Sequence, residues 1–404
     1  MKKILIINGE PFQDITATGI TLKNIFHEIP KERLSSIHIS KLKPDLKYLD
    51  DVFSYYKDSI ETEIDFPKSA FINKSKQTLR FPEIVKSELR IWDDLRVIKF
   101  SEKIIDYIVK SKAEVIYTCL GNLRVISLVL FAQKLLGCTI VPHFLDDWKT
   151  VIFSKKRLII HQKLLNFQIK KVIALCKTGM AISEKMATEY AEEYSIPFYS
   201  IMNCVPDNQI TPYKDINKEF KRFVYAGGLH LKRWKSLLLL SRSFQRLERQ
   251  SLFKLEIYCP ENDKIKFHKY FSEFPFVHFM GHIPTEMIKS TLLEADVLIH
   301  CESFENSIKK YTRLSVSTKI PSYLMVSKLL LVFGPPEIES IQYIKRNNAG
   351  LPISTTNTND ISIILDAILL NKIDFEIMIK NGLDLVKRNH SFSSVNEKLI
   401  NIFN

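Results

Sequence analysis

The feature that most constrains the fold of this chain is a repeated alternation of short apolar runs with longer segments of helical periodicity. The apolar runs predict strands at residues 3–8, 114–118, 139–145, 179–183, 198–203, 222–226, 255–259, 276–281, 296–301, 329–334 and 350–353. Strands separated by helices form parallel sheets with helices on both faces. The sequence therefore predicts an α/β protein with doubly wound sheets.

The length of the chain predicts two domains. At 404 residues it exceeds the roughly 250–300 residues at which a single hydrophobic core stops growing. Residues 206–220 are polar and proline-containing, as in an interdomain linker. We expect domains at 1–205 and 221–385, facing each other across a cleft, and a C-terminal helix within 386–404 that returns to the first domain. Residues 41–92 lack clear periodicity and predict loops and short helices.

The cysteines and the apolar segments predict a cytoplasmic protein. Six cysteines occur singly at irregular spacing, which argues against both a disulfide framework and a zinc site. The N-terminal sequence MKKILIINGE has an apolar run too short for a signal peptide. The most apolar window, residues 125–141, is interrupted by Gln133 and Lys134, so we expect no membrane-spanning segment.

The formal net charge of +13 has its clearest source in residues 149–177. No acidic residue occurs between Asp147 and Glu184. The cations of this basic stretch are Lys149, Lys155, Lys156, Arg157, Lys163, Lys170, Lys171 and Lys177. They predict either attachment to the inner face of the cell membrane, where each charge contributes about 1 kcal/mol, or a solvated helix face. No nucleic-acid-binding signature is present, so nucleic acid is not an expected partner.

The sequence RFVYAGGLHLKRWKSLLLL, residues 222–240, combines the features of a phosphate-binding turn. A β-rich run ends at Gly227 and Gly228, and a cationic turn then precedes an apolar helical run. The cations are Lys232, Arg233 and Lys235. Glycines allow a ligand to approach the backbone, and the amides at a helix start attract anions. The alternative is an ordinary strand-to-helix corner with solvated lysines.

Ordered motifs over nearly the whole chain resemble a known family. They are TGIT after the first strand, then HFLDDW, AISEKMATEY, MNCVPD, YAGGLHLKRWKSL, ADVLIHCESFE, STKIPSYL and VFGPPE. In this order they resemble the retaining family 4 glycosyltransferases of the GT-B fold, particularly bacterial enzymes that assemble O-antigen or capsule polysaccharides. The resemblance implies two Rossmann-like domains and transfer of a sugar from a nucleotide-diphospho-sugar to a glycan or lipid-diphosphate-linked hydroxyl.

The resemblance implies that the second domain binds the sugar donor. Gly227 and Gly228 would let the diphosphate approach, with Arg233 as its first cationic contact and Lys235 as its second. A guanidinium binds phosphate bidentately and offsets the charge on a leaving diphosphate. The family usually has an arginine directly after the first glycine, where this chain has Gly228. Gly19, in the TGIT motif, is implied to line the donor site as well.

The family also carries two glutamates, one near the sugar and one on the ribose. Aligning ADVLIHCESFE without a gap places Glu305 at the first position, with Glu302 as the competing candidate. The second position is Ser322, whose hydroxyl can still bond a ribose, though more weakly than a carboxylate. Thr318 and Lys319 could contact the diphosphate instead. For Lys319 the alternative is a solvated helix start.

Only one tight group of titratable residues occurs in the first domain, and it lies at the end of a predicted strand. His143, Asp146 and Asp147 would lie on the acceptor side, where carboxylates orient a hydroxyl or share a proton, and Trp148 follows them. Alternatively, Asp-Asp-Trp caps the next helix and packs its indole. The aspartates are adjacent rather than spaced as Asp-x-Asp. We therefore expect no metal and no other cofactor besides the nucleotide-sugar.

The resemblance implies a retaining reaction in which the acceptor hydroxyl attacks the sugar on the face that the diphosphate leaves. Arg233, Lys235 and Lys319 would stabilise the departing diphosphate, and Glu305 or Glu302 would position the sugar. Two alternatives stay open. A nucleotide-sugar epimerase can use the same fold, and a non-catalytic nucleotide-sugar-binding or scaffold protein would explain why Gly228 and Ser322 replace charged family residues.

Overall fold

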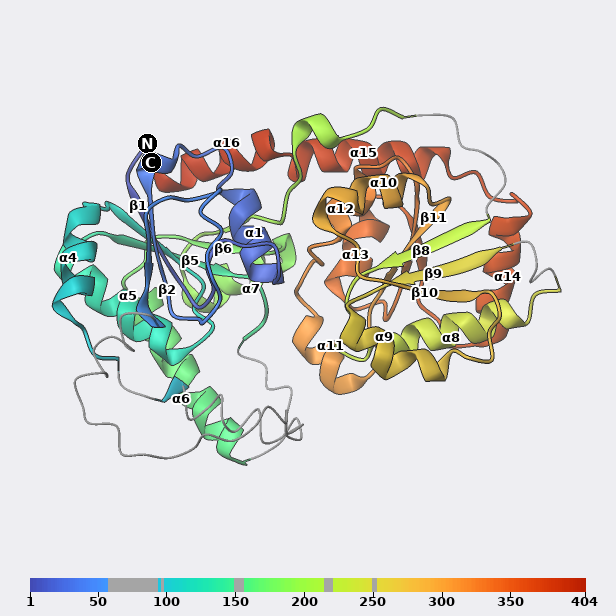
Figure 1. The fold of residues 1–404 in the computed structure, drawn as a ribbon, viewed down its shortest axis with the longest axis horizontal. Coiled ribbons are helices and arrows are strands. Elements are labelled where there is room, and N and C mark those ends of the chain that lie inside the picture. Colours follow the sequence, from blue (N-terminus) through green and yellow to red (C-terminus); the bar gives the residue numbers. More distant parts are fainter. Residues whose placement is uncertain (57–93, 96–97, 149–155, 214–220, 249–252) are drawn as a thin grey trace, which may run out of the picture. The chain divides into compact units, whose positions relative to one another are not determined.

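The chain divides into two compact units, the first comprising Met1–Ser200 with Leu399–Asn404 and the second Ile201–Lys398 (Figure 1). The computed structural model describes residues 1–56, 94–95, 98–148, 156–213, 221–248 and 253–404, with the backbone alone for 156–159. By this division the predicted linker, residues 206–220, belongs to the second unit, and its last residues, 214–220, lie outside the described part of the chain.

The first unit is built on a seven-stranded sheet of order β3-β2-β1-β4-β5-β6-β7, in which neighbouring strands are parallel. Its strands are β1 (Ile4–Asn8), β2 (Leu34–His38), β3 (Val52–Ser54), β4 (Val115–Thr118), β5 (Thr139–Phe144), β6 (Gly179–Ala181) and β7 (Phe198–Ser200). Its helices are α1 (Ala17–Ile25), α4 (Glu102–Ser111), α5 (Leu123–Leu136), α6 (Lys156–Ile173) and α7 (Glu184–Tyr194). The strand order reverses between β1 and β4, where doubly wound sheets usually bind ligands.

The second unit contains a six-stranded parallel sheet of order β10-β9-β8-β11-β12-β13. Its strands are β8 (Arg222–Ala226), β9 (Lys254–Tyr258), β10 (Val277–Gly281), β11 (Val297–Cys301), β12 (Leu329–Phe333) and β13 (Leu351–Ile353). Its helices are α8 (Arg233–Gln245), α9 (Glu261–Phe267), α10 (Ile288–Leu293), α11 (Asn306–Thr312), α12 (Ile320–Leu324), α13 (Glu339–Arg346), α14 (Thr358–Leu369) and α15 (Glu376–Asn389). The strand order reverses between β8 and β11.

Two strands of the first unit, β2 and β3, were not predicted by the sequence pattern. β2 reads LSSIH, so its polar residues hide the apolar run that marks a buried strand. Two polar groups of the strand have distant partners: the Ser35 hydroxyl donates to Asp51 at 2.5 Å, and the Ser36 backbone amide donates to Tyr107 Oη at 3.2 Å. β3 lies within residues 41–92, where loops and short helices were expected; residues 57–93 lie outside the described residues.

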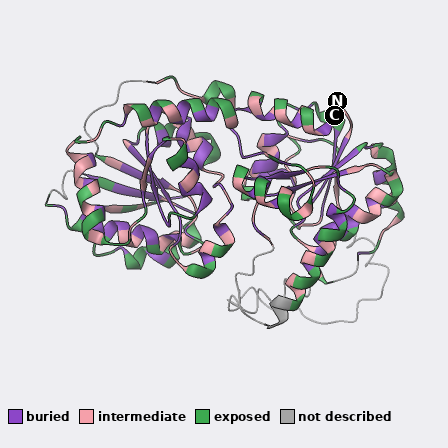
Figure 2. Cartoon of the chain, turned by 180° about the vertical axis from the view of Figure 1, so that it is seen from behind, coloured by how far each residue is buried: buried purple, intermediate pink, exposed green. Residues whose placement is uncertain are grey.

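The central strands of the second unit's sheet are buried on both faces (Figure 2). Because side chains alternate along a strand, Phe223 and Tyr225 of β8 pack into one core with Leu237 of α8, while Val224 packs into the other with Tyr323 of α12. β11 and β12 are buried at every position, as expected for strands covered on both sides. Because these strands pack on both faces, the positions of their C-terminal ends and of the loops that follow are fixed.

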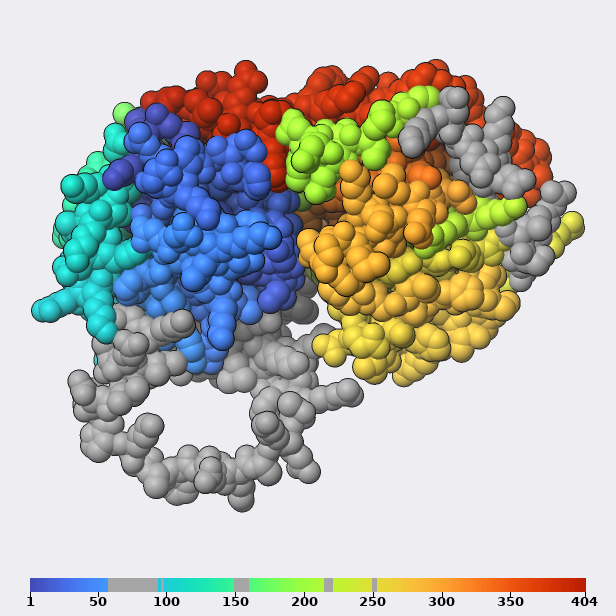
Figure 3. Space-filling model, turned by 45° about the horizontal axis from the view of Figure 1, so that its top comes forward, coloured from blue at the N-terminus to red at the C-terminus, as the bar shows by residue number. Residues whose placement is uncertain are grey.

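The last helix, α16 (Phe392–Phe403), begins in the second unit and ends in the first. Phe403 stacks on Phe26 with ring centroids 6.2 Å apart, and Lys2 Nζ donates to the carbonyl of Asn404 at 2.8 Å. Figure 3 shows the red C-terminal residues against the blue N-terminal ones. Among the described helices, none is both long enough and apolar enough to cross a lipid bilayer.

Candidate functional site

The turn between β8 and α8 has an unusual backbone. After Gly227 and Gly228, Leu231 and Lys232 both adopt the left-handed conformation, with φ of 55° and 60°, although neither is glycine. Such conformations cost on the order of 1–3 kcal/mol each and cluster at functional sites. Two hydrogen bonds hold the turn: Tyr225 Oη donates to the Gly228 carbonyl at 2.7 Å, and the Leu229 amide donates to Asp263 at 2.7 Å. The turn is therefore fixed rather than loosely connected.

The end of the Lys319 side chain lies directly against Gly227. A Cβ at residue 227 would lie 2.0 Å from Lys319 Cε and 2.7 Å from its Nζ. Tyr323, on the helix that follows Lys319, donates its hydroxyl to the Ala226 carbonyl and accepts the Ala226 amide, both at 2.8 Å. The glycine turn and the segment before α12, far apart in the sequence, thus form one site.

A buried ion pair lies beside this turn at the start of α8. Arg233 Nη2 donates to Glu302 Oε1 at 3.2 Å and to Oε2 at 3.3 Å, and both residues are buried. Buried His300 Nε2 lies 3.0 Å from Glu302 Oε1 and donates to it, because an ionised carboxylate only accepts. Burial alone would raise the pKa of Glu302, but the charge of Arg233 and the His300 hydrogen bond lower it to about 2. Glu302 is therefore ionised, and its oxygens are engaged by protein donors.

Two further contacts fix the backbone of Glu302. Its carbonyl accepts the Ser236 hydroxyl at 2.7 Å, and its amide donates to the Phe333 carbonyl at 2.8 Å. Gly334, after β12, leaves room for it, since a Cβ there would lie 2.9 Å from Glu302 Cβ. The backbone of Glu302, whose carboxylate pairs with Arg233, is therefore fixed by contacts with α8 and β12.

Lys319 supplies the second cation of the site. Enclosure by the protein, reinforced by the charge of Arg233, lowers the pKa of Lys319 to about 7. Its Nζ makes no hydrogen bond or ion pair with any residue in the described part of the chain. With Arg233 neutralised by Glu302, Lys319 gives this group of side chains a positive charge that depends on pH.

Thr318 and Ser322 flank Lys319 but have different surroundings. The Thr318 carbonyl accepts a hydrogen bond from Asn203 Nδ2 at 2.8 Å. Ser322 is half-buried in α12, whose first residues pack against the sheet. Sequence reasoning placed Thr318 and Lys319 near the diphosphate and Ser322 near the ribose, and the structure brings Lys319 to the glycine turn.

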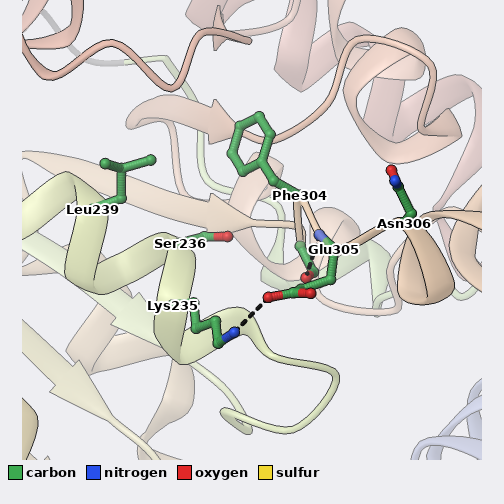
Figure 4. Close-up of a pocket in the computed structure, with 7 residues that line it drawn as sticks. Lys235, Ser236, Leu239, Phe304, Glu305 and Asn306 are labelled. Atoms are coloured by element: carbon green, nitrogen blue, oxygen red, sulfur yellow. Dashed lines mark hydrogen bonds and ion pairs between the residues drawn. The ribbon is translucent and has the colours of Figure 1, made fainter.

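Glu305 and Lys235 belong to a separate cluster (Figure 4). Lys235 Nζ lies 2.5 Å from Glu305 Oε1, and this pairing lowers the pKa of Glu305. The two residues lie at a cavity of about 360 Å³. Its lining residues are Lys235, Ser236, Leu239, Ser303, Phe304, Glu305 and Asn306. The two glutamates proposed from the sequence thus face different cations: Glu302 faces Arg233, and Glu305 faces Lys235.

In the first unit, His143 and Asp147 are buried and engaged by tyrosines. His143 Nδ1 lies 2.8 Å from Tyr117 Oη, and the Tyr190 hydroxyl donates to Asp147 Oδ1 at 3.0 Å. Trp148 packs against Phe144, with ring centroids 5.6 Å apart. His143 and Asp147 are therefore part of the core at the end of β5, and the half-buried Trp148 packs at its edge.

Asp146 follows β5, and Gly19 lies in the first turn of α1 in the same unit. Asp146 is half-buried, and its carbonyl accepts the Trp148 amide at 2.9 Å. The Gly19 amide, in the first turn of α1, donates to Thr16 Oγ1 at 3.2 Å. A Cβ at residue 19 would lie 2.9 Å from the backbone carbonyl oxygen of Gln13, so glycine is required here by the packing of the preceding loop.

Sequence reasoning missed His300 and His230. His300 could have been found from strand parity, because side chains two residues apart lie on the same side and Glu302 follows it by two. His230 Nε2 lies 3.5 Å from Arg233 Nη1, three residues away in the turn. Within the described ranges, no group of three or more His, Cys, Asp or Glu side chains is placed to hold a metal ion.

Comparisons with known proteins place this geometry in a common fold. No family model and no curated protein matches the sequence. A structure of Anabaena Alr3699/HepE in complex with UDP and glucose superimposes with a TM-score of 0.65 at 9% identity, over 100% of this chain and 99% of that one. TarM gives a TM-score of 0.66 at 12% identity, over 100% and 99%.

Sucrose-phosphate synthase from Thermosynechococcus elongatus is also similar, with a TM-score of 0.66 at 10% identity, over 100% of this chain and 98% of that one. These likenesses concern the fold, since the identities are low. They confirm the predicted α/β class with two doubly wound parallel sheets. The chain has the two Rossmann-like domains found in GT-B glycosyltransferases.

Proposed function

We propose that this protein is a glycosyltransferase that uses a nucleotide-diphospho-sugar donor. The observation that carries the proposal is the group formed by the glycine turn, Arg233 and Lys319 where the strand order reverses between β8 and β11. A site with an arginine held by Glu302 and a lysine whose Nζ has no partner among the described residues suits a diphosphate. The similar Anabaena HepE has been solved with UDP and with UDP-glucose, so uridine diphosphate sugars are the first donors to test.

The proposed roles follow from the contacts. Gly227 and Gly228 let the diphosphate approach the backbone, Arg233 and Lys319 bind its oxygens, and Lys235 adds charge from the neighbouring cavity. Because Glu302 is engaged by Arg233 and His300, we assign it to holding Arg233. The remaining residues that we propose for the donor side are Glu305, Gly19, Thr318 and Ser322.

The proposed reaction retains the configuration of a transferred hexose. The acceptor oxygen forms its bond to C1 on the face from which the diphosphate leaves, the C1–O bond to phosphate breaks, and the hydroxyl proton passes to the departing diphosphate. Asp146, the least buried of the titratable candidates in the first unit, would orient the acceptor hydroxyl, and His143, Asp147 and Trp148 would support it from the core.

For the acceptor we propose a glycan or lipid-diphosphate-linked sugar of bacterial surface polysaccharide synthesis, such as O-antigen or capsule. The basic stretch 149–177 would bring the protein to the cytoplasmic face of the cell membrane, where such acceptors lie. Lys149 and Lys155 of that stretch are outside the described residues, as are the side chains of Lys156 and Arg157. The adjacent Asp146-Asp147 pair lacks the Asp-x-Asp spacing of a metal-bridged diphosphate site, so we propose a reaction without a metal, and EDTA should leave turnover unchanged.

Titration calorimetry with a panel of nucleotide-sugars tests the donor part of the proposal, and mass spectrometry of products with candidate acceptors tests transfer. Binding of a donor followed by transfer supports a glycosyltransferase. Turnover of the donor without an acceptor would instead identify an epimerase. Donor binding without turnover would identify a binding protein, and no binding to any donor would rule out the proposal.

A further inference from the structure

The imidazole of His230 lies against the second glycine of the turn between β8 and α8. A Cβ at residue 228 would lie 2.5 Å from His230 Nδ1 and 2.9 Å from its Cε1, so a side chain at this position would displace the ring. The backbone of Gly228 does not itself require glycine, because its φ is not positive. The absence of a side chain at residue 228 therefore gives the imidazole its place in the turn.

The strained backbone after His230 joins this imidazole to the first cation of the site. Leu231 and Lys232 are left-handed in succession, and the Arg233 amide then donates to the His230 carbonyl at 3.3 Å. His230 Nε2 lies 3.5 Å from Arg233 Nη1. Strained conformations of this kind cluster at ligand-binding sites, where the surrounding contacts maintain them. Their result here is an exposed imidazole held between Gly228 and Arg233.

The contact with Arg233 indicates which ring nitrogen of His230 carries the proton. A guanidinium only donates, so Nε2 presents its lone pair to Arg233 and the proton of the neutral ring is on Nδ1. Desolvation of the ring against the turn and the charges of Arg233 and Lys319 lower the pKa of His230 to about 4. The carboxylates of Asp263 and Glu302 oppose this shift without cancelling it. At neutral pH the ring is therefore uncharged, and its one N–H lies on the side of the glycine.

Three hydrogen-bond donors at the glycine pair have no partner in the described part of the chain. One is the Gly228 amide, and the second is His230 Nδ1. The third is Lys319 Nζ, which lies 2.7 Å from the position of a Cβ at Gly227. A backbone amide, an imidazole N–H and an ammonium all suit phosphate oxygens, which only accept. We propose that His230 binds the sugar donor by donating a hydrogen bond from Nδ1 to a diphosphate oxygen at this glycine pair.

The inference rests on the proposed function, because it adds a contact to the same donor site. UDP and inorganic diphosphate are suitable probes, since they need neither a sugar nor an acceptor. Binding of either probe without any involvement of His230 would overturn this inference alone. No binding of UDP, inorganic diphosphate or any nucleotide-sugar would overturn the proposed function together with it.

Titration calorimetry of the full chain with both probes tests which ring nitrogen makes the contact. The amide nitrogen of asparagine is bonded to Cγ, as Nδ1 is in histidine, whereas that of glutamine is one atom farther along the side chain. His230→Asn should therefore keep most of the affinity. His230→Gln and His230→Ala should bind about tenfold more weakly, as expected for the loss of a hydrogen bond to a charged group. The matched control is His278→Ala, an exposed histidine of β10, which should bind as the unchanged protein does.

The variant Gly228→Ala tests the position of the ring. Its new Cβ would displace the imidazole, so it should lose about as much affinity as His230→Ala does. The double variant Gly228→Ala/His230→Ala should lose no more than either single variant, because both substitutions remove the same contact. Neither residue is buried, so the melting temperature should stay unchanged in all three variants. Additive losses of affinity would count against the contact.

Nuclear magnetic resonance of histidine labelled with 13C at Cε1 reports the contact directly. A bound diphosphate favours the charged imidazole, so His230 should titrate at a pH about one to two higher when UDP is present. The signal of His278 should not respond to UDP. The proposal is overturned by an unchanged His230 titration in a protein that binds UDP, or by a His230→Asn variant as weak as His230→Ala. A melting temperature that falls in parallel with affinity would show that the imidazole supports the turn and not the ligand.

Discussion

At the residue scale, the environment of Glu302 determines how the donor-side cluster is organised. This buried carboxylate accepts from Arg233 and His300. Sequence alignment favoured Glu305 as the family glutamate, and the structure pairs that residue with Lys235 on the surface instead. The two candidate glutamates thus differ in burial and in the cation that each one pairs with.

Removing Arg233 should destabilise the fold as well as weaken donor binding. Arg233→Ala leaves the Glu302 carboxylate buried without its main cation, which typically costs about 3–5 kcal/mol. The double variant Arg233→Met/Glu302→Gln removes both charges and should recover most of that loss. Urea unfolding of the single and double variants measures the difference. Equal stability of Arg233→Ala and the unchanged protein would contradict the pairing.

The same pair predicts a dependence of stability on acid. A carboxyl whose pKa is lowered by folding, here to about 2, stabilises the fold above its ordinary pKa of 4.5 and loses that contribution as the pH falls toward 2. Glu302→Gln should remove this part of the acid sensitivity. The measurement is the difference in unfolding free energy between the two proteins across that range. A constant difference would count against a strongly acidic Glu302.

Lys319 predicts that donor binding takes up a proton. With a pKa of about 7, its amine is mostly neutral at about pH 8 and mostly charged at about pH 6. A bound diphosphate favours the charged form, so binding should take up nearly one proton at the higher pH and little at the lower, and affinity should fall as the pH rises. Calorimetry in buffers with different ionisation enthalpies measures the uptake. Lys319→Arg, always charged, should bind without it.

At the scale of elements, the connection from β8 to α8 is strained. Leu231 and Lys232 are left-handed in succession, which L-residues adopt only at a cost. The hydrogen bonds of Tyr225 and Leu229 keep this shape, and the start of α8 then brings Arg233 to the end of β11. A relaxed turn would start the helix differently and separate Arg233 from Glu302.

Lys232→Gly should therefore raise the free energy of unfolding by about 1 kcal/mol, because glycine adopts this conformation without strain. The matched control is Lys110→Gly, an exposed lysine in the last turn of α4, where glycine costs up to about 1 kcal/mol. Thermal and urea unfolding of the two variants should change in opposite directions. A loss of stability in both would mean that the turn is not strained.

At the scale of the whole molecule, the C-terminal segment belongs to both units. α15 and the start of α16 lie in the second unit, while residues 399–404 pack with the first. The aromatic contact between Phe403 and Phe26 is buried, and the nearby pair of Lys2 with the Asn404 carbonyl is exposed. The last residues therefore complete the core of the unit in which the chain begins.

Phe403→Ala should destabilise the first unit by about 3–5 kcal/mol through the cavity it leaves. Hydrogen exchange would then show faster opening of β1 and α1 than of the second sheet. Lys2→Ala removes only an exposed contact and should change stability by less than about 0.5 kcal/mol. Similar effects of the two substitutions would argue that the C-terminus adds no core to the first unit.

The sequence by itself determined the two parallel sheets, because buried strands separated by helices leave a strong periodic signal, and it located the glycine turn and its cations. It missed β2, whose Ser35 and Ser36 are satisfied by distant partners, Asp51 and Tyr107. Only the tertiary structure decided that Arg233 meets Glu302. The reason is physical: residues 302–305 follow a strand end, where no periodicity constrains the side chains, and their partners come from segments about seventy residues away.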